Sequence, residues 1–270
     1  MISSLHNIMV SKTLREQKIQ KKQKFMNSIT THKKLRIPYP LKEYYNCVIP
    51  LNIFQTWHTK SLPLLMHHAV NKIKAFNPKF NYFLYDDNDC REFIQNNFPK
   101  EVLYAYDNLI PGAYKADLWR YCILYKKGGI YVDIKYQPIN NFKFINLTEK
   151  EHWVLDADGF GIYNALIVSK PENPILIKAI YQIVENVNKK YYGSNCLDPT
   201  GPYLLAKYFT PHEKNSFDMK HDFLSNLNNR FIYFNNYIVL RSYNGYLEEH
   251  NHNKKVHHYS YLWSGKKIYK

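Results

Sequence analysis

Apolar and polar positions alternate with two different periods along this chain, and the order of these periods predicts an α/β protein. Short apolar runs typical of strands occur at residues 51–55, 82–85, 130–133, 153–155 and 165–168. Helical spacing predicts helices over residues 63–76 and 113–126, and from Pro174 to about residue 186. Strands that alternate with helices are typical of a three-layer α/β/α domain with a mostly parallel central sheet.

Turn-forming and capping residues separate these elements. Pro63 stands at the start of the first helix, where its fixed backbone angle favours helix initiation. Asp87 or Asn88 is expected to cap the helix that follows the second strand. The pair Gly128-Gly129 ends the helix over residues 113–126 and lets the chain turn sharply into the strand that closes at Asp133.

The composition predicts one globular domain with an appended segment. The chain has 270 residues, of which 45% are hydrophobic and 16% aromatic, enough to bury a sizeable core. Residues 1–45 are polar and basic and close with Pro38-Tyr39-Pro40, so we interpret them as a basic arm and linker. Residues 46–270 form the predicted catalytic domain.

The positive charge is distributed unevenly. Of a formal net charge of +15, residues 1–36 carry +8, from nine Lys or Arg and one acid. A basic arm suggests contact with an anionic surface such as a membrane or a nucleic acid, and the alternative is a solvated extension without a partner. The remaining body is mildly basic, which suits an anionic substrate such as a sugar nucleotide.

The spacing of the cysteines and the hydropathy of the chain restrict the class of protein further. Four cysteines are scattered without a CxxC pair, so neither a zinc site nor a disulfide framework is indicated. No run of 18 or more apolar residues and no apolar signal core occurs. We therefore expect a cytoplasmic protein, and a viral or bacterial setting fits this expectation.

The candidate chemistry lies around the helix over residues 113–126 and the strand after it. Ala113, Asp117 and Arg120 share one stripe of the helix, so the carboxylate and the guanidinium can enter one pocket. The alternative is an ordinary surface ion pair. Asp133 and Asp86 each close an apolar strand, and a buried carboxylate requires a cation, a metal or strong donors. Together these residues predict a convergent polar site at the strand ends.

Six segments between residues 48 and 265 resemble, in order, the DxD glycosyltransferases of family 32. That family includes fungal initiating mannosyltransferases and is related to the glucosylating domains of clostridial toxins. The segments are Phe54-Gln55-Thr56-Trp57, Leu84-Tyr85-Asp86-Asp87, Lys115 to Tyr121, Gly128 to Asp133, Thr200-Gly201-Pro202 and His257-His258 with Trp263. The resemblance implies a GT-A fold. It also implies transfer of a hexose from a UDP- or GDP-linked donor, with retention, to a hydroxyl of a glycan or glycoprotein.

The resemblance also implies roles for individual residues. Asp117 and Arg120 would grip the hydroxyls of the donor sugar, and Asp133 would contact ribose, sugar or metal. Trp57 would border the nucleotide base, the alternative being a core Trp at a strand end. The remaining expected donor-binding residues are Gln55, Thr56, Asp86, Ala113, Asn164 and Trp263. Gly201 and Pro202 would shape the acceptor groove, or form only a turn and a helix start.

The chain departs from the family pattern at Lys135, where the second acid of the DxD motif is expected. A protonated lysine cannot be a metal ligand. Lys135 could replace the metal and stabilise the leaving diphosphate. Alternatively, Mn²⁺ or Mg²⁺ binds through Asp133 and His258 while Lys135 points away, or the enzyme is inactive. Because Asp133 and Lys135 share one side of an extended strand, we favour a working site with weakened metal dependence.

The C-terminal segment from His257 to Trp263 is expected to close over the donor, with a side-chain N–H directed toward the diphosphate. The alternative is a C-terminal strand with ordinary surface histidines. No residue is indicated as a nucleophile, so the leaving diphosphate is expected to help take the acceptor proton. The competing functional class is an inactive protein of the same fold that binds polyanions through residues 1–36.

Overall fold

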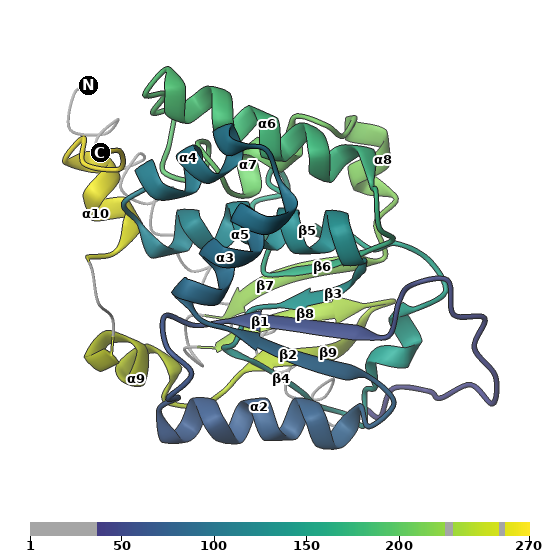
Figure 1. Ribbon diagram of the computed structural model, residues 1–270. Coiled ribbons are helices and arrows are strands. Elements are labelled where there is room, and N and C mark those ends of the chain that lie inside the picture. Colours follow the sequence, from purple (N-terminus) through teal and green to yellow (C-terminus); the bar gives the residue numbers. More distant parts are fainter. Residues whose placement is uncertain (1–36, 225–228, 254–256) are drawn as a thin grey trace, which may run out of the picture.

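The computed structural model describes residues 37–224, 229–253 and 257–270, and two β-sheets form the centre of the fold (Figure 1). A four-stranded sheet has the order β2-β1-β3-β6, and a five-stranded sheet has the order β4-β9-β8-β7-β5. The strands of the first are β1 (Asn52–Thr56), β2 (Asn81–Tyr85), β3 (Gly129–Val132) and β6 (Leu166–Ser169). The strands of the second are β4 (Tyr136–Pro138), β5 (Val154–Leu155), β7 (Met219–Leu224), β8 (Asn229–Phe234) and β9 (Tyr237–Ser242).

The four-stranded sheet confirms the α/β class and the mostly parallel sheet predicted from the sequence. β1 pairs in parallel with both β2 and β3, whereas β6 runs antiparallel to β3. The carboxyl ends of β1, β2 and β3 therefore lie at one edge of the sheet. Asp133 follows β3 at this edge, as the sequence predicted.

Helices cover one face of the four-stranded sheet (Figure 1). They are α3 (Asp87–Asn97), α4 (Lys100–Asn108), α5 (Gly112–Lys127) and α6 (Pro174–Asn188). Phe54, Tyr131 and Ile167 point from the sheet into this helical side and share one buried cluster with its apolar residues. The short helices α7 (Pro202–Ala206), α8 (Pro211–Asn215) and α10 (Tyr259–Ser264) complete this half of the molecule.

The opposite face is covered by α2 (Leu64–Phe76) and by the five-stranded sheet (Figure 1). Ile53, Ile130 and Val168 alternate with the residues of the helical side and pack with Ile232 and Leu240 in a second buried cluster. The sequence analysis did not predict β7, β8 and β9. The short helix α9 (Tyr246–Asn253) and the 3₁₀ turn at Phe144–Leu147 were also not predicted.

Two helices differ from the expectations of the sequence analysis. Asp86, rather than Asp87 or Asn88, caps α3, and its carboxylate accepts hydrogen bonds from the backbone N–H groups of Asn88 and Asp89. Asp89 bonds back to the N–H of Asp86, which completes a capping box. The C-terminal segment forms the helix α10 and not the strand considered as an alternative.

Residues 37–45 lie against the body, where Tyr39 packs on the rings of Phe142, Phe234 and Tyr237. The basic arm at residues 1–36 lies outside the described residues, so the predicted domain boundary stays a prediction. In the part of the chain that the structure describes, no helix combines the length and apolarity that a membrane crossing requires.

The turn from α5 into β3 depends on two glycines in left-handed backbone conformations. Gly128 has φ of 58° and Gly129 has φ of 121°. A Cβ on Gly129 would lie 2.7 Å from the backbone oxygen of Asn52 on β1. Only glycine therefore allows β3 to pair with β1 directly after the helix and to deliver Asp133 to the sheet edge.

We predict that Gly129→Ala destabilises the protein by roughly 1–3 kcal/mol or more, because backbone strain and a clash with β1 coincide. Gly112→Ala is the matched control, since a Cβ there meets nothing within 4 Å. Urea unfolding of both variants measures the effect. Equal stability of the two would show that the turn tolerates a side chain.

Candidate active site

A buried ion-pair network stands at the carboxyl end of β3 and joins α5 to that strand. The guanidinium of Arg120 lies 3.4 Å from the carboxylate of Asp117 and 3.3 Å from that of Asp133. The side chains of Asp117 and Arg120 are 11% and 7% exposed. The pair is therefore buried and is not the surface ion pair considered as an alternative, and these three residues lie together as the convergent site requires.

The remaining hydrogen-bonding positions of Asp117 are occupied by neutral donors. The amide of Asn164 donates to Oδ1 at 2.8 Å, and the hydroxyl of Thr200 donates to Oδ2 at 2.7 Å. The backbone oxygen of Asn164 accepts a hydrogen bond from Arg120 at 2.7 Å. Burial raises the pKa of Asp117, and Arg120, Thr200 and Asn164 oppose this effect. The acid thus depends on its partners to stay ionised.

Asp133 is held between two cations and a hydroxyl. Lys135 forms an ion pair with Oδ2 of Asp133, and the hydroxyl of Tyr131 donates to Oδ1 at 2.8 Å. Burial acts to raise the pKa of Asp133, but Lys135 and Arg120 outweigh it, and the pKa is lowered. Burial acts to lower the pKa of Lys135, but Asp133, Tyr163 and Tyr246 together outweigh it, so the pKa is raised and the ammonium stays charged.

Tyr131 is a member of this site that the sequence analysis missed. Its ring lies under the guanidinium of Arg120, with 4.3 Å between the guanidinium carbon and the ring centroid. Tyr131 stands two residues before Asp133, and the common side of an extended strand was the signal that could have identified it. Thr200 was noted only as part of a turn, although its hydroxyl binds Asp117.

The side chains of Gln55 and Thr56 bind groups within the protein, and their predicted contact with the donor stays a prediction. Gln55 is fully buried, its amide donates to the Val132 carbonyl at 3.2 Å, and its oxygen accepts from the Tyr82 hydroxyl at 2.7 Å. The hydroxyl of Thr56 donates to the carbonyl of Tyr85 at 2.9 Å. Both side chains fix neighbouring strands.

Asp86 follows β2 at the same sheet edge, and its carboxylate forms the capping box of α3. Its predicted contact with the donor stays a prediction. Ala113 is exposed in the first turn of α5, and its predicted donor contact stays a prediction.

Trp57 packs against a small cluster that includes Ile134, the residue between Asp133 and Lys135. Its ring lies 5.5 Å from that of His250 on α9, measured between centroids. The structure thus brings the indole to the same strand end as the ion pairs. Its contact with a nucleotide base stays a prediction.

The C-terminal segment adopts a different arrangement from the expected one. The indole N–H of Trp263 donates to the carbonyl of Tyr192 at 2.6 Å and is not available to a diphosphate in this conformation. His258 caps α10, and Ser260 donates its backbone N–H to Nδ1 of His258. The ring of Tyr259 packs on Tyr114 of α5, which brings α10 beside the site.

The side chains around Asp133 do not fit a divalent cation. Both oxygens of Asp133 are engaged by Lys135, Arg120 and the hydroxyl of Tyr131. Among the described residues, no group of three or more His, Cys, Asp or Glu is placed to hold a metal. Lys135 contacts Asp133 and does not point away, so the structure gives no support to metal ligation by Asp133 with His258.

Gly201 brings the start of α7 against the network. A Cβ at this position would lie 3.4 Å from Oδ2 of Asp117 and 3.2 Å from the backbone oxygen of Leu197. Pro202 follows as the first residue of α7 and is buried. The two residues shape the wall beside Asp117, and their contact with an acceptor stays a prediction.

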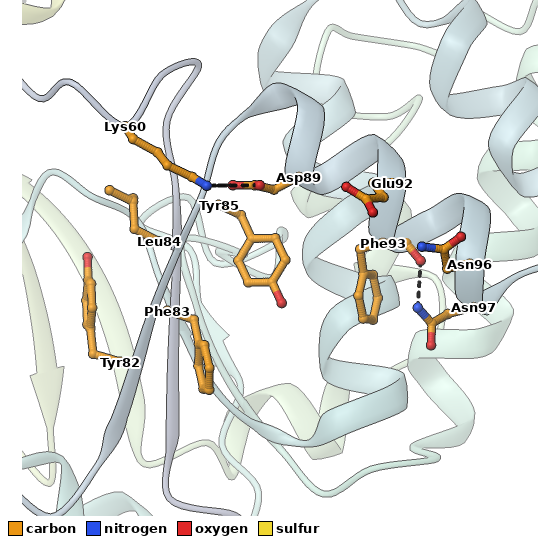
Figure 2. A pocket seen from close by; sticks show the side chains of 10 residues that line it. All are labelled: Lys60, Tyr82, Phe83, Leu84, Tyr85, Asp89, Glu92, Phe93, Asn96 and Asn97. Atoms are coloured by element: carbon orange, nitrogen blue, oxygen red, sulfur yellow. Dashed lines mark hydrogen bonds and ion pairs between the residues drawn. The ribbon is translucent and has the colours of Figure 1, made fainter.

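A cavity of about 520 Å³ opens elsewhere, beside the edge strand β2 and the helix α3 (Figure 2). Lys60 and Asp89 form an ion pair at its rim at 2.9 Å. None of the network residues lines this cavity. It holds no constellation of acids and cations comparable to the network, so we assign the chemistry to the network.

Comparisons with known proteins give the family. The sequence pattern described as "Glycosyltransferase sugar-binding region containing DXD motif" matches residues 63–153. An uncharacterized glycosyltransferase of Acanthamoeba polyphaga mimivirus is 30% identical over 173 residues, 63% of this chain and 68% of that protein. The chain belongs to this family of DXD glycosyltransferases.

Fungal relatives are similar over a shorter part of their length. Inositol phosphoceramide mannosyltransferase 3 of Schizosaccharomyces pombe is 31% identical over 188 residues, 69% of this chain and 49% of that protein. The chain thus spans about half the length of the fungal proteins it matches. Among solved structures, the glycosyltransferase PaToxG has a TM-score of 0.48 at 19% identity, covering 60% of this chain and 69% of that one.

We predict that Thr200→Val destabilises the protein by about 1.5–3 kcal/mol at neutral pH, because Asp117 loses a hydrogen bond to its charged form. The folded pKa of Asp117 lies above its ordinary value. The variant raises it further, so the loss shrinks as the pH falls from about 7 toward about 4 and Asp117 is protonated. Urea unfolding at several pH values measures this.

Thr200→Ser is the control, since it keeps the hydroxyl. Its cost should be smaller and nearly independent of pH. A Thr200→Val effect of the same size at both ends of the pH range would indicate a packing loss and not a loss of carboxylate solvation.

Proposed function

We propose that the protein transfers a hexose from a UDP- or GDP-linked sugar to a hydroxyl of a glycan or glycoprotein, with retention of configuration. The observation that carries this proposal is the buried guanidinium of Arg120 between Asp117 and Asp133 at the end of β3. Membership of the DXD family supports transfer from a sugar donor. A structural protein would have no use for two charged pairs concentrated at one sheet edge.

Asp117 and Arg120 are suited to bind the donor sugar. A carboxylate has about four lone-pair positions, and Asp117 uses only part of them on Asn164, Thr200 and Arg120. Sugar hydroxyls can donate to the positions that remain. Because its partners fix the carboxylate, little reorganisation is needed when the sugar binds.

Lys135 supplies the positive charge for the leaving diphosphate. Two carboxylates, Asp117 and Asp133, balance two cations, Arg120 and Lys135. A carboxylate at position 135 would leave this site with a surplus of two negative charges, which is the charge that a divalent cation neutralises. The ammonium of Lys135 therefore replaces both the second acid and the metal that such an acid would hold.

The transfer itself requires one bond to break and one to form at the anomeric carbon. The bond to the diphosphate oxygen breaks and its electron pair leaves with the diphosphate, while the acceptor oxygen bonds on the same face. Charge stabilisation by fixed cations lowers the barrier more than a nucleophile would in such a reaction. The relatives named mannosyltransferases make mannose the first sugar to test.

The setting of the reaction is also a proposal. The mimivirus relative supports a virus-encoded enzyme, and the cytoplasmic location stays a prediction. The polyanion-binding alternative rests on residues 1–36, which lie outside the described residues, and the comparisons lend it no support.

The donor is identified by a thermal-shift screen of UDP, GDP and their sugars, in EDTA and in Mn²⁺. We expect one nucleotide sugar to raise the melting temperature in both conditions. If no nucleotide sugar shifts the protein in either condition, the proposed function is wrong.

We predict that wild-type turnover survives EDTA, whereas Lys135→Ala lowers kcat by roughly 10²–10³, because the leaving group loses its cation. Lys135→Asp should be inactive in EDTA and regain activity with Mn²⁺, since it provides the missing acid. Lys170→Ala, at an exposed position, is the control for loss of a lysine. Nucleotide release measures all four proteins.

Strict metal dependence of the wild type, together with full activity of Lys135→Ala, would contradict the role given to Lys135. Calorimetric titration with Mn²⁺ provides a second test that does not require turnover. It should detect binding to Lys135→Asp and none to the wild type.

A further inference from the structure

A buried acid–histidine pair lies beside the network and takes no part in the function proposed so far. His221 on β7 contacts Asp156, which follows β5, with 2.9 Å between Nδ1 and Oδ1. Their side chains are 4% and 14% exposed. The imidazole stacks on the ring of Tyr163, with 3.7 Å between centroids and 6° between planes. The ring of His221 is therefore fixed on one edge and on one face.

The contacts of His221 define which nitrogen carries the proton. Burial lowers its pKa, the hydrogen bond and charge of Asp156 oppose this, and Lys135 and Arg230 lower it further. The net effect is a neutral imidazole at pH 7. A carboxylate accepts hydrogen bonds, so the ring proton sits on Nδ1 and faces Asp156.

The other ring nitrogen, Nε2, is buried and has no hydrogen-bond partner among the described residues. It presents a lone pair, and leaving such an acceptor unpaired costs about 1–3 kcal/mol. A purely structural histidine usually satisfies both nitrogens. The unused lone pair therefore calls for a donor from outside the described residues, and a hydroxyl group is small enough to supply one.

The position of the pair relates it to the acceptor side of the reaction. Tyr163 immediately precedes Asn164, whose amide binds Asp117. The ammonium of Lys135 lies 5.5 Å from the centroid of the Tyr163 ring. His221 and Lys135 thus both contact the ring of Tyr163, and the next residue along the chain, Asn164, binds Asp117.

The face of β7 that carries His221 continues to a more exposed residue, Phe223. Side chains alternate along a strand, so Phe223 lies on the same face as His221 and nearer the end of β7. Phe223 is 40% exposed, and the guanidinium of its cross-strand partner Arg230 lies 5.0 Å from its ring. An aromatic side chain and a cation thus lie next to His221 on this face of the five-stranded sheet.

We propose that His221, oriented by Asp156, binds the acceptor hydroxyl through Nε2 and takes its proton during transfer. This proposal rests on the glycosyl transfer proposed above. As the acceptor oxygen bonds to the anomeric carbon, its proton moves to Nε2. The electron pair of the broken bond leaves with the diphosphate, and the imidazolium later returns its proton to solvent. His221 is the catalytic residue, and Asp156 is a positioning residue that fixes its tautomer.

The test uses the full-length protein and hydrolysis of UDP-glucose and GDP-mannose, in which water serves as the acceptor. His221→Asn keeps a donor toward Asp156 but lacks Nε2. We expect kcat for hydrolysis to fall by about 10²–10⁴, with binding of the nucleotide sugar unchanged within about twofold.

His152→Asn is the matched control. His152 is also buried and pairs with an acid, Asp218, at 3.0 Å, but its ring packs on Phe234 and not beside Lys135. This variant should lose stability and keep the wild-type kcat. Equal kcat values for the wild type and His221→Asn would overturn the proposal, and so would an equal loss in both variants.

A measurement on the wild-type protein covers the case in which His221→Asn does not fold. Nitrogen-15 NMR of labelled histidine should show His221 neutral at pH 7, protonated on Nδ1 and not on Nε2. A proton on Nε2, or a charged ring, would overturn the proposal. If the wild type neither binds nor hydrolyses any nucleotide sugar, the proposed function fails and this proposal fails with it.

Discussion

The structure of the site depends on one buried guanidinium that neutralises two carboxylates from different elements. Arg120 projects from α5 and meets Asp117 on the same helix and Asp133 after β3. A charge removed from water is tolerated only when it is paired and hydrogen-bonded. The network therefore fixes the distance between helix and strand, and it extends through Asn164 after β5 and Thr200 before α7. Four separate segments of the chain are held by one electrostatic requirement.

Lys135 sets the net charge of this network, and the net charge determines what the site can bind. With the lysine in place, the number of cations equals the number of acids, and the site is neutral before a donor arrives. Under the proposed function, the diphosphate of the donor would meet a fixed ammonium, where a site with both acids of the DXD motif would bind an ion from solution. A fixed cation does not have to be bound from solution, but its electrostatic effect cannot be changed by the choice of metal.

Much of the half of the fold that carries the network could be predicted from the sequence. Apolar runs and glycines located β1, β2 and β3, α5 and the turn at Gly128-Gly129, because local backbone preferences determine these elements. The spacing of Asp117 and Arg120 gave their common helical face, and the strand end gave Asp133. The five-stranded sheet was missed because its strands depend on pairing between distant segments, which no local pattern contains.

The sequence did not show how individual polar side chains of the site are used within the protein. The resemblance assigned donor contacts to Gln55 and Asp86, but both side chains satisfy neighbouring backbone or side-chain groups. Sequence similarity identifies which residue occupies a position, but it does not predict the direction in which the polar atoms of that residue point. His221 was missed because its partner Asp156 is 65 residues away along the chain, and only the pairing of β5 with β7 brings the two together.

We propose above all that the Arg120 network binds the nucleotide sugar without a metal. A crystal structure of the wild-type protein with its nucleotide sugar, grown with Mn²⁺ present, tests it most directly. We expect sugar hydroxyls on Asp117 and Arg120, the diphosphate beside Lys135, and no anomalous manganese signal at Asp133. A manganese ion between Asp133 and the diphosphate with Lys135 displaced, or a donor bound in the cavity beside β2, would contradict the account.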